Sequence, residues 1–196
     1  MKIHLILFIG MVLTACGPEA EPLEAVAYKD EYGYTEKYSV KRFERTKEGL
    51  YQKTDAQGRL IEEANYRNDT LHGLRVLYFE SGDTMSVEHY ANGLFEGWFR
   101  SYHENGRLEL EGRYENNAMT DVWKRYYPDG QLMEAVTFQN NSENGPFTEY
   151  HPNGKLKATG AYLDGDNEHG ELKIYDETGA LLRTMMCNYG RCKTVE

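Results

Sequence analysis

Two cysteines near the end of the chain have the spacing of a structural disulfide. Cys187 and Cys192 enclose Asn188-Tyr189-Gly190-Arg191, in which Asn-Tyr-Gly favours a tight turn. Outside the cytoplasm a disulfide can persist, and across so short a loop it would tie together a final hairpin. A zinc site would need two further ligands, and nearby His169 alone is insufficient. A redox pair would normally be Cys-X-X-Cys, so we predict a disulfide that caps the C-terminal end.

A cluster of acidic residues offers oxygen ligands, but not at the spacing of a known cation loop. The cluster lies in one predicted loop and contains Asp164, Asp166, Glu168 and Glu171. Calcium accepts such oxygens, yet the EF-hand pattern of alternating Asp residues followed by Gly is missing. We therefore interpret the segment as a solvated loop and predict no metal site.

Other pairs of reactive side chains also favour a structural role. Glu109 and Glu111 are carboxylates of the kind that glycosidases use, but they are neighbours on the solvated face of one predicted strand. His103 and His151 occupy the same position of a repeat two units apart, which would separate them by about 20 Å. No Ser-His-Asp arrangement, phosphate loop or zinc spacing is present. We predict no catalytic residue, no cofactor and no enzymatic activity.

The third cysteine belongs to a different motif. A single Lys and an apolar run from Ile3 to Leu13 precede it, too short for a membrane span of about 20 residues but suited to a secretory signal. Leu13-Thr14-Ala15-Cys16 resembles the bacterial lipobox, in which cleavage precedes a cysteine that carries lipid. We predict a signal peptide at 1–15, lipid on Cys16 and membrane attachment through that lipid. An ordinary signal peptide with an accidental cysteine is the alternative. Gly17 in place of Asp favours the outer membrane, on its periplasmic or surface face.

Composition excludes several classes of partner. The 196 residues carry a net charge of −10, which argues against nucleic acid and against repeat surfaces that bind anionic lipid. A hydrophobic content of 40% is too high for a disordered acidic tail. Residues 16–27 combine the lipidated cysteine with Pro18, Pro22 and three glutamates, so we interpret them as an acidic tether.

The remainder of the chain repeats every 24 residues. Glycines recur at 58, 82, 106, 130 and 154, with the next at 179. A second series comprises Gly49, Gly73, Gly97, Asp121, Gly145 and Gly170, again 24 apart until a final step of 25. Five residues after members of this second series stand Tyr78, Tyr102, Tyr126, Tyr150 and Tyr175. We call the equivalent positions of successive copies a column. Several columns that keep the same spacing over six copies indicate a repeat architecture.

Each repeat has the pattern of a β-hairpin. Turns such as Glu104-Asn105-Gly106 and Pro128-Asp129-Gly130 favour a type I turn followed by a Gly in a bulge. The segment Arg107–Glu111 alternates strictly, as a strand with one solvated face does. The sequence therefore predicts an all-β fold: about twelve strands in one elongated, curled antiparallel meander with almost no helix. We expect a degenerate repeat at 28–48 as an N-terminal cap, hairpins at 49–186 and a C-terminal cap at 187–196.

The aromatic residues of the repeats are candidates for binding. The tyrosine column and the aromatics two residues after the second glycine series are an odd distance apart, so either a bulge brings them to one face or aromatics line both faces. The tyrosines could simply form the core, since stacked aromatics stabilise sheets. A single-layer sheet cannot cover every aromatic, however, and we predict Trp98 and Trp123 to be the exposed contact residues.

The order of these columns is similar to that of the bacterial MORN-repeat variant. The resemblance covers Gly49 to Tyr189 and rests on a Gly-aromatic opening, a Tyr, an Asn/Asp-Gly turn, a Leu and an Asn-Gly-like link. It implies the hairpin array, and it implies functions in protein scaffolding, at membranes, or as the antitoxin of a toxin–antitoxin pair. With the lipobox, we predict a lipid-anchored protein of the cell envelope that binds a protein partner. An immunity or antitoxin-type protein and a glycan-binding or cell-wall-binding protein are the alternatives.

Overall fold

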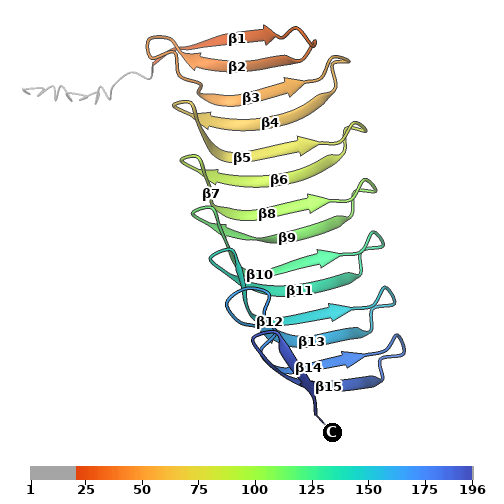
Figure 1. Cartoon of the computed structure of the whole chain (residues 1–196). Helices are drawn as coiled ribbons and strands as arrows, with labels where there is room; N and C mark the ends of the chain where they lie inside the picture. Colours follow the sequence, from red (N-terminus) through yellow and green to blue (C-terminus); the bar gives the residue numbers. More distant parts are fainter. Residues whose placement is uncertain (1–20, 196) are drawn as a thin grey trace, which may run out of the picture.

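The computed structural model describes residues 21–195 as one open antiparallel sheet, a single layer thick (Figure 1). Sixteen strands follow one another in chain order across the sheet, apart from the short β7, which pairs with β6. They are β1 (Leu23–Lys29), β2 (Thr35–Lys41), β3 (Gly49–Thr54), β4 (Leu60–Arg67), β5 (Thr70–Tyr78), β6 (Thr84–Ala91), β7 (Leu94–Phe95), β8 (Gly97–Tyr102), β9 (Leu108–Glu115), β10 (Ala118–Tyr126), β11 (Leu132–Gln139), β12 (Ser142–Tyr150), β13 (Leu156–Tyr162), β14 (Gly170–Tyr175), β15 (Leu181–Asn188) and β16 (Arg191–Thr194). The predicted all-β meander is confirmed.

The six repeats form the six predicted hairpins. These are β3–β4, β5–β6, β8–β9, β10–β11, β12–β13 and β14–β15. The strands beyond these twelve are the hairpin β1–β2, the final strand β16, and β7, which Glu96 separates from β8. Within the described residues, no helix has the length and hydrophobicity that a membrane span needs.

The N-terminal cap begins earlier than predicted. The segment expected to form the end of the tether, up to Ala27, is instead part of β1, which starts at Leu23. Val26 of β1 pairs with Tyr38 of β2, so the alternation of this segment continues the sheet. The turn between the two strands repeats the pattern of the later ones, with Gly33 at φ 91° and its N–H bonded to the Asp30 carbonyl. The degenerate repeat is therefore a hairpin that includes residues assigned to the tether.

The turns within the hairpins have the predicted geometry. In the hairpin β8–β9, the Gly106 N–H donates to the His103 carbonyl and the His103 N–H donates to the Arg107 carbonyl, both at 2.8 Å. Gly106 has φ 77°, as a type I turn followed by a Gly bulge requires. The turns of this type all lie along one edge of the array, on the right in Figure 1.

The links between hairpins lie along the opposite edge. Most are two-residue turns with positive φ at both positions, for example Asn116 at 49° and Asn117 at 67°, as in type I′ turns. Asn117 also bonds to Phe95 of β7, just after the preceding link: its N–H donates to the Phe95 carbonyl and its Oδ1 accepts the Phe95 N–H. Asn141 makes the same pair of bonds with Met119. The asparagines therefore connect neighbouring links along this edge.

The second glycine series marks a bend in the first strand of each repeat. Gly73, Gly97 and Gly145 have φ of 99°, 106° and 123°, and Asp121 adopts 60° in the same position. The pairing of β9 with β10 and of β4 with β5 is irregular beside these residues. Positive φ is accessible to Gly without steric cost and is tolerated by Asp, which explains the composition of this column.

One face of the sheet holds the core. The strand residues with buried side chains all share this core face: Val40, Tyr51, Ala64, Ser86, Glu88, Trp123, Val136, Phe147 and Cys187. No second layer covers it in residues 21–195 (Figure 1), so burial comes from crowding among neighbours on the same face. The Trp123 ring lies directly over Gly112, where an added Cβ would come within 2.0 Å of a ring atom. We call the opposite side the outer face.

The second repeat replaces the aromatic core with a charged network. Arg75 occupies the position of Trp123 and Phe147, and its guanidinium bonds to Glu62 at 2.7 Å and Glu88 at 3.1 Å. Glu88 is 6% exposed and also accepts the Tyr90 hydroxyl at 3.0 Å. The buried carboxylate of Glu88 therefore depends on Arg75 for its compensating charge.

Removal of Arg75 should destabilise the array strongly. We expect Arg75→Ala to lower the free energy of unfolding by about 3–5 kcal/mol, because it leaves the Glu88 carboxylate buried without a compensating positive charge. Arg125→Ala, which removes the half-exposed pair with Glu134, should cost about 1 kcal/mol or less. Urea unfolding followed by tryptophan fluorescence measures both, and equal losses would contradict the role assigned to Arg75.

Candidate interaction surface

The outer face carries a column of exposed apolar side chains. Each stands one residue after the bend of its repeat, and each is between 44 and 52% exposed: Leu50, Leu74, Trp98 and Val122. Successive members are separated by two strands, so the column extends roughly 30 Å along the array. We call these four residues the apolar column.

Two arginines lie beside Trp98. The Arg100 guanidinium lies over its ring, 5.4 Å from the centroid, and bonds to Glu111 at 3.3 Å. Arg113 is directly opposite Trp98 in the register of β8 and β9. The prediction that Trp98 is exposed is confirmed, with 47% of its surface accessible.

The prediction for Trp123 is wrong, because this side chain is 4% exposed. It stands two residues after its bend rather than one, and therefore faces the core side, where it packs against Phe99 and Tyr114. Its Nε1–H has no hydrogen-bond acceptor in the described part of the chain. The cavity beside it measures about 100 Å³, smaller than the 300 Å³ or more of usual small-molecule sites.

Aromatic residues line both faces, which resolves the question left open by the sequence. The tyrosine column lies on the outer face near the hairpin turns, and its members are half-buried: Tyr78, Tyr102, Tyr126, Tyr150 and Tyr175. Beside each tyrosine the register shifts, and the extra residue of this bulge belongs to the partner strand. The strand that carries the tyrosine therefore keeps the regular alternation of its side chains between the two faces. These residues are less accessible than the apolar column and are weaker candidates for contact.

Two of these tyrosines bind carboxylates of the preceding hairpin. The Tyr78 hydroxyl donates to Glu63 at 2.7 Å, and the Tyr126 hydroxyl donates to Glu111 at 3.0 Å. Desolvation, together with this bond, raises the pKa of Tyr78 to about 12. Hydrogen bonds from Gln52 and then Tyr78 lower the pKa of Glu63, which keeps its carboxylate ionised. The contribution of Glu63 to stability is lost only as pH falls through this lowered value.

Two histidines and one aspartate considered for chemistry have structural contacts. His103 Nε2 bonds to the Tyr126 carbonyl at 2.9 Å, and His151 Nε2 bonds to the Tyr175 carbonyl at 3.1 Å. Asp164 accepts the Tyr189 hydroxyl at 2.7 Å. Across residues 21–195, no group of three or more His, Cys, Asp or Glu side chains is arranged to hold a metal ion.

The C-terminal cysteines form the predicted disulfide. Cys187 of β15 and Cys192 of β16 are directly opposite each other, with an S–S distance of 2.01 Å. The bond closes the last hairpin of the array. Cys16, the predicted lipidation site, lies outside the described residues.

Comparison with protein families agrees with the repeat geometry. The model of the MORN repeat variant matches residues 95–116, 122–140 and 143–164. Three of the hairpin repeats are therefore similar to the MORN repeat variant. Each matched segment begins in or just before the first strand of a hairpin and ends in the turn that leads to the next hairpin. The three matched segments therefore correspond to the hairpins β8–β9, β10–β11 and β12–β13. No curated protein matches the chain.

Sequence reasoning missed most of the apolar column. Leu50, Leu74 and Val122 stand beside the second glycine series and in phase with Trp98, which is a detectable pattern. Aromatic residues alone do not reveal the column, because three of its four members are aliphatic. The column ends where Pro146 and then Glu171 take the equivalent positions.

The two tryptophans should differ sharply in their effect on stability. Trp123→Ala should lower the free energy of unfolding by about 3–5 kcal/mol, because it empties the centre of the core face. Trp98→Ala should change it by about 0.5 kcal/mol or less, as expected of an exposed side chain. Urea unfolding followed by circular dichroism measures both. A large loss on Trp98→Ala would show that the apolar column is part of the core.

Proposed function

We propose that this chain is a non-enzymatic, lipid-anchored protein of the cell envelope that binds a protein partner through its outer face. The observation that carries the proposal is the apolar column. The four apolar side chains are exposed at the same position of four successive repeats, and polar residues of the intervening strands stand opposite them: Asn65, His89, Arg113 and Thr137. A regular row of this kind, with Trp98 and Arg113 side by side, has the mixed composition of protein interfaces.

The chemistry of the column favours a protein over a lipid surface. Trp98 with its neighbouring arginines has the composition of interface hot spots, which are enriched in Trp and Arg. The net charge of −10 would repel an anionic membrane. The regular spacing of about 10 Å between members suits a partner that places apolar side chains at similar intervals.

The lipid anchor is supported by the sequence Leu13-Thr14-Ala15-Cys16 and the apolar run before it. We place the protein in the outer membrane, with the array on the periplasmic or surface side. An array that works by binding needs no cofactor, and its anchor would keep the outer face close to partners in the envelope.

The anchor can be tested by substitution of the predicted lipidation site. Cys16→Ser should move the protein from the membrane fraction to the soluble fraction of the envelope, because it removes the atom that carries the lipid. Immunoblotting of fractionated cells, with metabolic labelling by a fatty acid, measures both effects. Membrane retention of the variant would contradict lipid anchoring.

The partner can be identified by a photocrosslinking residue in the apolar column. A benzophenone amino acid at position 98 should yield one adduct of defined mass in cells, whereas the same residue at position 171, where the column ends, should not. The purified partner should then form a stoichiometric complex that Trp98→Ala weakens by at least about tenfold.

The same experiment separates the alternatives. A partner that is a small toxin would identify an immunity protein. Retention on peptidoglycan that is lost in Trp98→Ala, without any protein adduct, would replace the protein partner with a glycan.

A further inference from the structure

The two ends of the sheet differ in how they are closed. At the C-terminal end, the disulfide ties β16 to β15. At the N-terminal end, β1 is an edge strand of seven residues without a neighbouring strand in residues 21–195. An edge strand presents unpaired backbone groups that can accept another strand.

The hydrogen bonds at the ends of β1 show which of its residues face outward. The Arg42 N–H donates to the Pro22 carbonyl, and the Asp30 N–H donates to the Tyr34 carbonyl. Backbone groups alternate in direction along an antiparallel strand, so Glu24, Val26 and Tyr28 bond to β2. The outward residues are the remaining four: Leu23, Ala25, Ala27 and Lys29.

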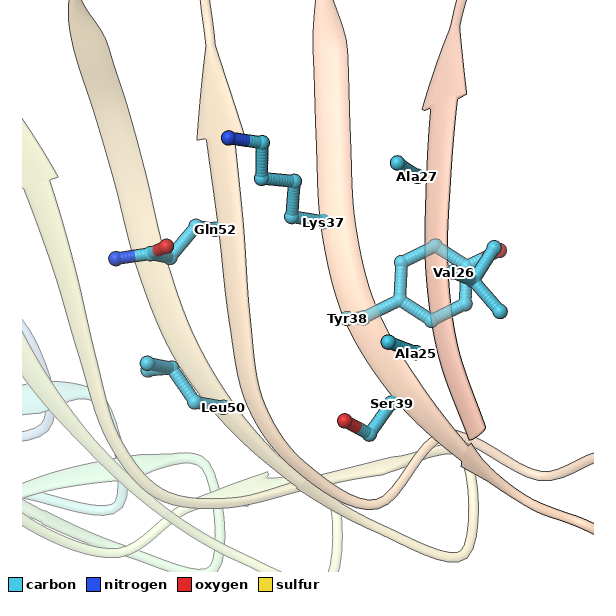
Figure 2. A pocket seen from close by; sticks show the side chains of 8 residues that line it. All are labelled: Ala25, Val26, Ala27, Lys37, Tyr38, Ser39, Leu50 and Gln52. Carbon is cyan, nitrogen blue, oxygen red and sulfur yellow. The ribbon is translucent and has the colours of Figure 1, made fainter. Parts of the chain in front are cut away.

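A depression of about 390 Å³ lies beside this edge on the outer face. Figure 2 shows Ala25 and Ala27 of β1 at its margin, with side chains of β2 and β3 across the floor. Residues lining it include Ala25, Ala27, Lys37, Ser39, Leu50 and Gln52. The small side chains at the margin leave room for larger side chains that enter from the edge.

We propose that β1 is a strand-addition site for an extended polypeptide segment of a partner protein, with large apolar side chains at the two alternate positions opposite Ala25 and Ala27. The backbone of the segment would pair with the outward groups of β1. Its two apolar side chains would fill the depression, as in other complexes where strand pairing supplies affinity and pockets supply specificity. This site adds a second surface to the proposed binding function and does not require the apolar column.

The charges at the edge define the segment further. Lys29 and Lys37 are exposed on the outer face, and neither takes part in an ion pair among the described residues. Glu24 on the core side is paired with Arg42 and Arg45. An added segment would therefore gain from carboxylates beside its apolar positions.

A display library of random twelve-residue peptides, selected on the mature protein, tests the proposal. Enriched peptides should alternate large apolar and polar residues, with Asp or Glu among the polar ones. Ala25→Pro should weaken their binding by at least about tenfold, because it removes an outward N–H and blocks pairing. The same variant keeps every hydrogen bond between β1 and β2, so its thermal unfolding should be unchanged.

Two variants serve as controls. Thr194→Pro makes the same change at an outward position of β16, the opposite edge, and should leave peptide binding unaffected. Trp98→Ala should also leave it unaffected, which separates this site from the apolar column. On binding, the amides of Ala25 and Ala27 should exchange more slowly with solvent, whereas that of Val26, already bonded, should not change.

Three results would overturn the proposal. One is a selection that yields no peptide sensitive to Ala25→Pro. Another is peptide binding that Trp98→Ala abolishes, since that would assign the peptides to the apolar column. The third is a dimer by light scattering that Ala25→Pro converts to monomer, because a second copy would then occupy the edge.

Discussion

The structure depends on the burial of a core in a sheet that has no second layer. An aromatic side chain on a flat sheet would keep much of its surface in water. Here Trp123 and Phe147 are each 4% exposed, because the strands bend at the glycine column and crowd the side chains of one face together. Gly112 and Gly160 contribute by leaving room for the rings that lie over them. Each hairpin therefore depends on its neighbours for burial, as in other repeat proteins.

The same bend produces the exposed surface. Where the core face is compressed, the outer face spreads, and the residue directly after the bend is pushed into solvent. Trp98 and Trp123 illustrate this, since they differ by one position relative to the bend and by 47% against 4% in exposure. The exposure of the four positions in the apolar column is thus a consequence of how the core is formed. Polar residues would fit equally well there, yet this sequence has Leu, Trp or Val.

The 24-residue period and its turn residues were sufficient to predict the hairpins and the turn type, and the spacing of Cys187 and Cys192 was sufficient to predict the disulfide, because each depends on local sequence. It was harder to predict which face of the sheet each side chain occupies. Strand alternation alone places Trp98 and Trp123 on opposite sides, but it does not say which side the bend compresses, and that depends on pairing between strands. The start of the array at Leu23 was missed for a similar reason: Leu23–Lys29 contains none of the repeating glycines, and its pairing to β2 is what shows it to be a strand of the sheet. The charged network around Arg75 was also invisible, since its three members belong to different strands.

The two surfaces differ in what they could recognise. The apolar column repeats with the fold, so a partner bound there would contact several hairpins and would be sensitive to the number of repeats. The free edge of β1 occurs once, so it could distinguish one end of the array from the other. If Cys16 carries lipid, the seven residues from it to Leu23 can span at most about 25 Å, which would keep the open edge close to the membrane. A partner segment added to β1 would then be held near the membrane, while the column would extend away along the array.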